Sequence, residues 1–518
     1  LITNKHVLIK VFGAAVQGID ATLITIEVNS SRGCMFYLVG LPDSAVKESH
    51  QRIISALQVN GYRIPTSNII INMAPADIRK EGSAYDLPLA IGMLAAGEVI
   101  QPDKLNRYLM MGELSLDGSL QPIKGALPIA IKARELGFEG IIVPRQNALE
   151  AAVVNQIQVY GVENIKEVIE FFNGKQELTP TIVNTREEFY AQQSSFDLDF
   201  ADVKGQENVK RALEVAAAGG HNIILIGAPG SGKSMLAKRL PSILPPLSLG
   251  ESLETTKIHS VAGRLQNNTG LISKRPFRDP HHTISTVAMT GGGSYPQPGE
   301  ISLAHNGILF LDELPEFNRS VLEVLRQPLE DRKITISRVK SNVEYPASFM
   351  LVASMNPCPC GYYNHPTKAC VCSPGQVQKY LNRISGPLLD RIDLQIEVVP
   401  VPFEKMSDAH PGEASSSIRE RVISARQIQE NRYADIPGVY CNAQMSSKLL
   451  SLYARPDDKG LALLKNAMNR LNLSARAYDR ILKVARTIAD LENSDLIQPS
   501  HLAEAIGYRN LDREDWAG

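Results

Sequence analysis

A glycine-rich loop followed by a lysine and a serine carries the clearest chemistry in the sequence. Gly227, Gly230 and Gly232 lack a Cβ, so the backbone N–H groups around them can approach phosphate oxygens closely. A helix that begins near Lys233 adds the positive end of its dipole, Lys233 can reach the β- and γ-phosphates, and the Ser234 hydroxyl is placed for Mg²⁺. The apolar run before the loop and the helical pattern after it disfavour a chance glycine turn. The residues predicted to bind nucleotide are Gly227, Ala228, Pro229, Gly230, Ser231, Gly232, Lys233, Ser234 and Met235.

Two other apolar runs end in polar side chains suited to the same reaction. Ile308–Leu311 indicates a buried strand that ends at Asp312, which should enter the Mg²⁺ shell, and at Glu313, which should polarise the attacking water. The run 349–355 ends at Asn356, which resembles the sensor 1 residue that orients this water or senses the γ-phosphate. The alternative for Asn356 is an ordinary asparagine in a turn after a strand.

The segment Phe200–Glu207 lies before the loop and is similar to the box that encloses adenine in AAA+ ATPases. This resemblance implies that Val203 and Gln206 lie near the base and that the cofactors are ATP and Mg²⁺. From Phe200 onward, strand, loop and helix patterns repeat as in a doubly wound parallel sheet.

Two arginines are expected to complete the nucleotide site. Gly386–Leu394 resembles the arginine-finger segment of MCM helicases and magnesium chelatases, which implies that Arg391 faces the γ-phosphate of a neighbouring subunit in a ring. A structural salt bridge is the alternative for Arg391, and Arg383 is the fallback finger. Ser474 can cap a helix and place Arg476 in its first turn, where a cation opposes the helix dipole and is better explained by an anionic ligand. Arg476 is similar to the sensor 2 arginine.

Four cysteines form two pairs, with one residue inside each pair and nine between the pairs. Four thiolates suffice for a closed tetrahedral Zn²⁺ site, although the spacing differs from the usual two-residue knuckle. Reduced cysteines in a buried loop and an iron–sulfur cluster are the alternatives. The predicted structural zinc ligands are Cys358, Cys360, Cys370 and Cys372.

The segment Lys333–Tyr345 alternates apolar and polar residues and turns near residue 340, which predicts a hairpin. Arg338 and Lys340 lie at or beside its tip, where the copies in a ring would line the pore with positive charge and bind DNA phosphates. The alternative is a hairpin edge that lysine keeps soluble.

A glycine-rich segment between the nucleotide motifs, Gly291–Ile301, resembles the helix-2 insert of the MCM and chelatase clade. The pair His281 and His282 precedes it. Neighbouring residues on a loop point to different sides, so this pair is not expected to bind a metal.

The chain has 518 residues, which is more than one hydrophobic core usually includes and suggests about three domains. The formal net charge is −1, so binding of nucleic acid must come from a local basic surface. No apolar run approaches a membrane span and no signal-peptide pattern is present, so we expect a cytoplasmic protein without a membrane partner. The expected multidomain α/β organisation is an α+β domain over 1–173, a linker over 174–199, the ATPase core over 200–403, a connector over 404–416 and a helical lid over 417–518.

Within the first domain, alternation and apolar runs predict strands at 22–28 and 68–73 and a hairpin turned at Asp117 and Gly118. Helical periodicity predicts helices at 44–59, 87–96, 127–136 and 165–172.

The segment Lys80–Pro88 resembles the protease-like domain of Lon, on the fold also seen in domain 2 of ribosomal protein S5. In that protease a serine nucleophile needs a lysine base. Ser83 lies near the position of the serine, but Leu127 stands where the lysine is expected and Lys124 is a weak substitute. The domain is therefore expected to be a proteolytically inactive scaffold or a collar that faces DNA, and acylation of Ser83 would indicate a protease instead.

Together these motifs span nearly the whole chain, which resembles the YifB/ComM family of magnesium-chelatase-like AAA+ proteins in the MCM-like clade. The resemblance implies a hexameric, ATP-driven helicase that acts on single-stranded and branched DNA and promotes branch migration of recombination intermediates during natural transformation. A chelatase- or chaperone-like ATPase that remodels a protein partner is the alternative function.

Overall fold

The computed structural model describes residues 7–509 apart from 32, 64–66, 185–188, 191–192, 194–195, 266–269, 294–295, 339–340, 364, 366, 402–411 and 472. It divides into two compact units, of which the first comprises Leu1–Ala191 and Leu249–Ile272 and the second comprises Gln192–Ser248 and Ser273–Gly518. None of the helices in this part of the chain combines the length and the apolar character needed to cross a lipid bilayer.

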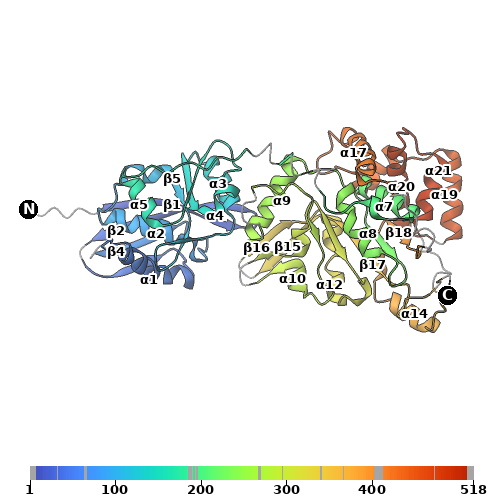
Figure 1. Ribbon diagram of the computed structural model, residues 1–518, viewed down its shortest axis with the longest axis horizontal. Coiled ribbons are helices and arrows are strands. Elements are labelled where there is room, and N and C mark those ends of the chain that lie inside the picture. The colour runs from blue at the N-terminus through green and yellow to red at the C-terminus, as the bar shows by residue number, and fades with distance from the viewer. Residues whose placement is uncertain are drawn as a thin grey trace, which may run out of the picture. The chain divides into compact units, whose positions relative to one another are not determined.

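The first unit contains a seven-stranded mixed sheet (Figure 1) with the order β3-β4-β2-β1-β5-β8-β9. The strands of this unit are β1 (Val7–Gln17), β2 (Asp20–Ser31), β3 (Phe36–Val39), β4 (Asn68–Ala74), β5 (Tyr108–Met110), β6 (Glu113–Leu114), β7 (Leu120–Gln121), β8 (Gly140–Pro144) and β9 (Gln158–Val162). Of these, β6 and β7 pair with each other outside the seven-stranded sheet. Its helices are α1 (Ser44–Val59), α2 (Asp86–Ala96), α3 (Ala126–Glu135), α4 (Arg145–Ala151), α5 (Ile165–Phe172) and α9 (Leu249–Ala262).

The predicted elements of this unit are confirmed. The helices α1 and α5 have the expected bounds, and α2 and α3 begin one residue earlier than expected. The predicted hairpin is formed by the antiparallel pair β6 and β7, and Gly118 adopts a φ of 84° in its turn, which favours glycine. Every residue of α2 is buried against its surroundings, so its largely apolar sequence has no polar face.

The helix α9 comes from the middle of the range assigned to the ATPase core and packs in the first unit. It contacts α3, and the Ser260 carbonyl accepts a hydrogen bond from the Gly125 N–H at 3.1 Å. The Ser260 hydroxyl also donates to the carboxylate of Glu150, whose pKa is raised by burial. Neither this helix nor the domain on which it packs was predicted from the sequence.

The second unit contains a five-stranded parallel sheet with the order β11-β14-β17-β10-β18, which confirms the predicted parallel α/β core. Two short ribbons, β12–β13 and β15–β16, lie outside this sheet. The strands are β10 (Ile223–Ile226), β11 (Phe277–Arg278), β12 (Gly291–Gly292), β13 (Gln297–Pro298), β14 (Ile308–Leu311), β15 (Lys333–Arg338), β16 (Ser341–Pro346), β17 (Met350–Met355) and β18 (Leu394–Glu397).

The helices of this unit include the predicted helical region at the carboxyl end of the chain, α17 to α21 (Figure 1). This region shares one apolar core with the sheet, in which Val209 and Leu213 of α7 are buried together with Ile481 and Ile488 of α20. The helices are α7 (Glu207–Gly219), α8 (Lys233–Arg239), α10 (Thr286–Thr290), α11 (Glu300–Leu303), α12 (Arg319–Glu323), α13 (Arg326–Asp331), α14 (Pro374–Leu381), α15 (Gly386–Leu389), α17 (Ser415–Arg432), α18 (Ser447–Tyr453), α19 (Asp458–Arg470), α20 (Ala475–Leu491) and α21 (Pro499–Gly507).

A buried carboxylate connects α20 to the amino end of the sheet. Asp393 precedes β18 and accepts hydrogen bonds from Arg480 Nη1 at 3.0 Å and from the Asn222 N–H at 3.1 Å, and it lies 3.4 Å from His221 Nδ1. Burial alone would raise the pKa of Asp393, but Arg480 and His221 hold it well below its ordinary value. The ionised carboxylate therefore stabilises the contact between the helical region and the sheet.

The substitution Asp393→Asn is expected to lower the free energy of unfolding at pH 7 by about 3–5 kcal/mol, because it leaves buried charge without its partner. A carboxyl group with a depressed pKa in the folded state adds stability above its unfolded pKa, near 3.8, and this stability is lost as the pH falls below that value. Urea unfolding between pH 3 and 7 should show that the free energy of unfolding falls less with decreasing pH in the variant than in the wild type.

The matched control is Asp390→Asn, which removes the partner of the exposed Arg476 at 3.2 Å. A surface pair of this kind contributes about 0–1 kcal/mol. Equal effects of the two substitutions would contradict the role assigned to Asp393.

Candidate active site

The predicted strand, glycine-rich loop and helix are present as β10, residues 227–232 and α8. Gly232 has a φ of 93° where it leads into α8, a conformation that side chains with a Cβ rarely adopt. A Cβ on Gly227 would lie 2.4 Å from the carbonyl oxygen of Val398, so the close approach of the backbone just after β18 also requires glycine there. The loop therefore has the backbone shape that exposes N–H groups at the start of a helix.

Lys233 is buried and lies against the loop that precedes it. Its Nζ donates to the carbonyl oxygens of Gly227 at 2.7 Å and Ala228 at 3.0 Å, and to Asn356 Oδ1 at 3.2 Å. Burial lowers the pKa of Lys233, whereas Asp312 and Glu313 act in the opposite direction. A polyphosphate in the loop would supply further negative charge and hold the ammonium in its charged form.

Ser234 and Asp312 are joined directly, because Ser234 Oγ donates to Asp312 Oδ2 at 2.6 Å. The second carboxylate oxygen of Asp312 accepts hydrogen bonds from the Ser354 hydroxyl and from the Glu313 N–H, the latter at 3.1 Å. A hydroxyl and a carboxylate at this distance are oxygen ligands of the kind that Mg²⁺ prefers. These two predicted metal ligands therefore fit the ion.

The parallel sheet explains why these residues meet. Gly227 follows β10, Asn356 follows β17 and Asp312 follows β14, and these three strands are neighbours with β17 in the middle. The carboxyl ends of parallel strands lie along one edge, where ligands bind in open α/β sheets. The structure thus brings together Lys233, Ser234, Asp312 and Asn356.

The two residues implied for the adenine differ in their contact with the loop. Gln206 Nε2 donates to the carbonyl oxygen of Ser231 at 2.9 Å, whereas its Oε1 is buried without a hydrogen-bond partner among the described residues. Val203 is 1% exposed in the apolar core, and Met235 is 39% exposed at the start of α8. Gln206 and Met235 are thus closer to the glycine-rich loop than Val203, whose side chain is part of the apolar core.

Arg391 lies at the opposite edge of the sheet. Arg391 is 7% exposed, and its guanidinium donates to Glu330 Oε1 and to the Pro387 carbonyl, each at 2.5 Å. The Arg391 carbonyl accepts from Asn222 Nδ2 at 2.9 Å, directly before β10. Within one chain Arg391 therefore makes the structural ion pair that was the alternative interpretation.

Arg383 and Arg476 are exposed. Arg383 Nη1 lies 2.9 Å from Glu316 Oε1, and Arg476 Nη1 lies 3.2 Å from Asp390 Oδ2. The predicted cap is confirmed, because Ser474 Oγ accepts from the N–H of Ala477 in the first turn of α20. Arg476 is thus held in the first turn with 64% of its side chain exposed.

Sequence reasoning missed two side chains beside the predicted acids. Ser354 is fully buried and donates to Asp312, and the signal for it was a hydroxyl within an otherwise apolar strand. His282 Nδ1 lies 3.8 Å from Glu313 Oε2. The expectation that His281 and His282 point to different sides is wrong, because their ring centroids lie 4.1 Å apart after the chain bends at this loop.

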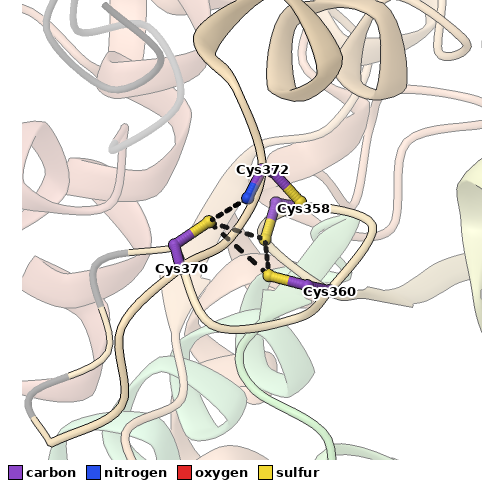
Figure 2. A group of neighbouring side chains, drawn as sticks. All are labelled: Cys358, Cys360, Cys370 and Cys372. Carbon is purple, nitrogen blue, oxygen red and sulfur yellow. Dashed lines mark hydrogen bonds between the residues drawn. The ribbon is translucent and has the colours of Figure 1, made fainter.

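The four predicted zinc ligands converge on one point (Figure 2). The Cys358 sulfur lies 3.3 Å from that of Cys360 and 3.7 Å from that of Cys370, and all four sulfurs lie within 4.8 Å of one another. A tetrahedral Zn²⁺ with Zn–S bonds of about 2.3 Å would separate its ligand sulfurs by roughly 3.8 Å. None of the four cysteines forms a disulfide, so this cluster could hold a metal ion.

The predicted hairpin is confirmed as β15 paired with β16. Lys333 at its base lies 2.9 Å from Glu344 Oε1. Lys340 and the side chain of Arg338, which are the predicted DNA contacts, lie outside the described residues.

In the first unit, Ser83 contacts an acid. Its hydroxyl donates to the carboxylate of Glu113, and Leu127 is buried in α3. Within the described residues, Ser83 has no hydrogen bond to a lysine, and Lys124 packs near Gly263.

Comparisons with known proteins match almost the whole chain. Residues 199–406 match the family described as magnesium chelatase, subunit ChlI, residues 26–147 match subunit ChlI of Mg-chelatase, and residues 412–509 match the ChlI C-terminal family. Competence protein ComM of Haemophilus influenzae is 44% identical over 507 residues, which cover 97% of this chain and 97% of that protein.

The uncharacterized protein YifB of Escherichia coli is also 44% identical, over 96% of each chain. Lon protease 2 of Bacillus subtilis is 29% identical over 130 residues, which are 24% of this chain and 23% of the protease. A Lon-like fold of the first domain stays a prediction.

The substitution Ser354→Ala is expected to raise the Mg²⁺ concentration that half-saturates ATP hydrolysis by about 10- to 100-fold, because Asp312 would lose the hydrogen bond that orients it. The measurement is the ATPase rate across a Mg²⁺ titration at fixed ATP. Ser302→Ala is the control, because Ser302 is also fully buried but its hydroxyl has no hydrogen-bond partner among the described residues. The same Mg²⁺ requirement in both variants would contradict this role of Ser354.

Proposed function

The chain belongs to the YifB/ComM family of magnesium-chelatase-like AAA+ ATPases, and from this premise we propose that it is a ring-forming, ATP-driven DNA helicase. Its proposed task is branch migration of recombination intermediates during natural transformation, on single-stranded and branched DNA. The name of the Haemophilus influenzae relative, a competence protein, supports this task. The observation that carries the proposal is that Arg391 and Arg476 lie at the sheet edge opposite to the nucleotide-site residues.

This separation supports a ring. Lys233 and Asp312 lie beyond the carboxyl ends of the strands, whereas Arg391 and Arg476 lie at their amino ends. β10 is four residues long, so the two edges lie roughly 13 Å apart at about 3.3 Å per residue. Arg391 is therefore proposed to act on the nucleotide of a neighbouring copy, which a closed hexameric ring would supply at every interface. Release of its ion pair with Glu330 would accompany this contact.

Within the site, Lys233 and the loop N–H groups are proposed to bind the phosphates, and Ser234 and Asp312 to bind Mg²⁺. The bound ion would stabilise charge on the transferred phosphoryl group. Glu313 polarises the attacking water and Asn356 orients it. Loss of the neighbour's contact after hydrolysis would change the preferred arrangement of the two copies and move the hairpins along DNA.

The cysteine cluster is proposed to hold a structural Zn²⁺. Four thiolates leave no open coordination position, so the ion would stabilise the fold and take no part in hydrolysis. Two backbone N–H groups already donate to sulfurs, Tyr363 to Cys358 at 3.3 Å and Cys372 to Cys370 at 3.4 Å, and they would support negatively charged thiolates.

The substitution Lys233→Ala is expected to lower the ATPase rate at least about a hundredfold and to abolish ATP-driven unwinding of forked DNA, because the developing phosphate charge loses its buried cation. Lys238→Ala is the matched control on the same helix, where Lys238 is half-exposed and 3.7 Å from Asp279. Unwinding that persists in Lys233→Ala would reject the motor.

The substitution Lys340→Ala is expected to weaken binding of single-stranded DNA and to reduce its salt dependence, while basal ATP hydrolysis is unchanged. Lys333→Ala on the same hairpin is the control, since Lys333 is paired with Glu344. Fluorescence anisotropy across a salt series measures the DNA affinity and its salt dependence for each variant. Equal DNA affinity in the wild type and Lys340→Ala would reject the hairpin as the DNA contact, and an ATPase that responds to a protein partner but not to DNA would favour the remodelling alternative.

A further inference from the structure

The loop that carries the four cysteines is shaped by the sulfur cluster and by short-range contacts such as that between the Tyr362 and His365 rings. Its described residues between β17 and α14 form neither strand nor helix. Val371, between two of the cysteines, is 84% exposed, so this part of the loop is not anchored in an apolar core. Cys358 is fully buried, while the other three are partly exposed. The convergence of the sulfurs in Figure 2 joins the two ends of this loop, the pair Cys358 and Cys360 after β17 and the pair Cys370 and Cys372 before α14.

The same loop forms part of the wall of the nucleotide site. Only Pro357 separates Cys358 from Asn356, whose Oδ1 accepts from Lys233 Nζ at 3.2 Å. Gly361 lies directly against the glycine-rich loop, because a Cβ on it would lie 2.4 Å from Cδ of Pro229.

A small pocket beside the glycine-rich loop shows a third contact between the two loops. Pro357, Tyr363 and His365 line this pocket together with Gly227 and Ala228. The N–H of Tyr363 donates to Cys358 Sγ, so one wall of the pocket is bonded to a predicted metal ligand. A change in the position of the Cys358 sulfur would therefore also move Tyr363 in the wall of the pocket.

We propose that a zinc ion bound by Cys358, Cys360, Cys370 and Cys372 acts as a clip that holds this loop against the glycine-rich loop, so that zinc and nucleotide bind with positive coupling. The inference rests on the proposed ATP site and adds to it a dependence on a second ion that does not contact the nucleotide. When the clip is closed, Asn356 and Gly361 are already in place and nucleotide binding does not have to order them. When it is open, nucleotide binding must also order the loop.

Coupling of this kind is typically 5- to 150-fold in affinity and is reciprocal. Loss of zinc is therefore expected to weaken nucleotide binding by about tenfold or more. Bound nucleotide must tighten zinc binding by the same factor.

The first test compares the full-length wild type with Cys370→Ser/Cys372→Ser. Zinc content is measured by mass spectrometry, and the Kd of a non-hydrolysable ATP analogue is measured by calorimetry. The wild type should contain one zinc per chain, and the double variant should lose the zinc and bind the analogue about tenfold more weakly. Cys34→Ser is the control, because Cys34 is exposed and outside the cluster.

A second variant tests the contact without touching a ligand. Gly361→Ala should keep its zinc and still bind the analogue more weakly, because the added Cβ pushes the loop away from Pro229. Gly438→Ala is matched for backbone strain, since Gly438 has a φ of 78° against 82° for Gly361, but a Cβ there meets nothing within 4 Å. Only Gly361→Ala is expected to change the affinity for the analogue.

A third measurement needs no variant and remains decisive if the cysteine variant fails to fold. Zinc affinity of the wild type, measured by competition with a chelator, should rise in the presence of the analogue by the factor found above. If the wild type contains no zinc, or if its zinc affinity is the same with and without the analogue, the proposed coupling is wrong. A zinc-containing wild type that does not bind the analogue overturns the ATP site instead.

Discussion

The register of three parallel strands is the constraint on which the rest of this protein depends. Ile226 of β10 lies opposite Met355 of β17, and Leu311 of β14 lies opposite Ala353, so the three strands end close to one edge. Alternate side chains of a strand point to opposite faces, so a shift by one residue would turn Ser354 away from Asp312. Lys233, Ser234 and Asp312 meet because the hydrogen bonds of the sheet hold this register.

The amino edge of the same sheet has a different role. There a buried carboxylate, Asp393, binds Arg480 of the helical region and the backbone of Asn222, and Arg391 is packed beside it. The nucleotide site and the arginine region are therefore parts of one core, shared by the sheet and the helices α7 and α20.

Local patterns in the sequence were enough to predict the three strands that end at the site, the loop and the helix that follows it. Ile223–Ile226, the glycines and the helix from Lys233 occur where their spacing predicts them, and the hairpin of β15 and β16 has the expected pairing. The capping role of Ser474 was predictable for the same reason, because a cap acts within one turn of its own helix. These features depend on neighbours in the chain.

Contacts between distant residues were decided only by the tertiary structure. Helical periodicity did not show that α9 packs with the first unit, nor could the sequence show that Arg391 is buried against Glu330 or that Gly361 lies on Pro229. The sequence by itself determined the residue types and local elements that could bind a nucleotide and a soft metal. The fold decided which of these groups touch, because the distance between side chains from different elements depends on packing and strand order, and neither is encoded by spacing along the chain.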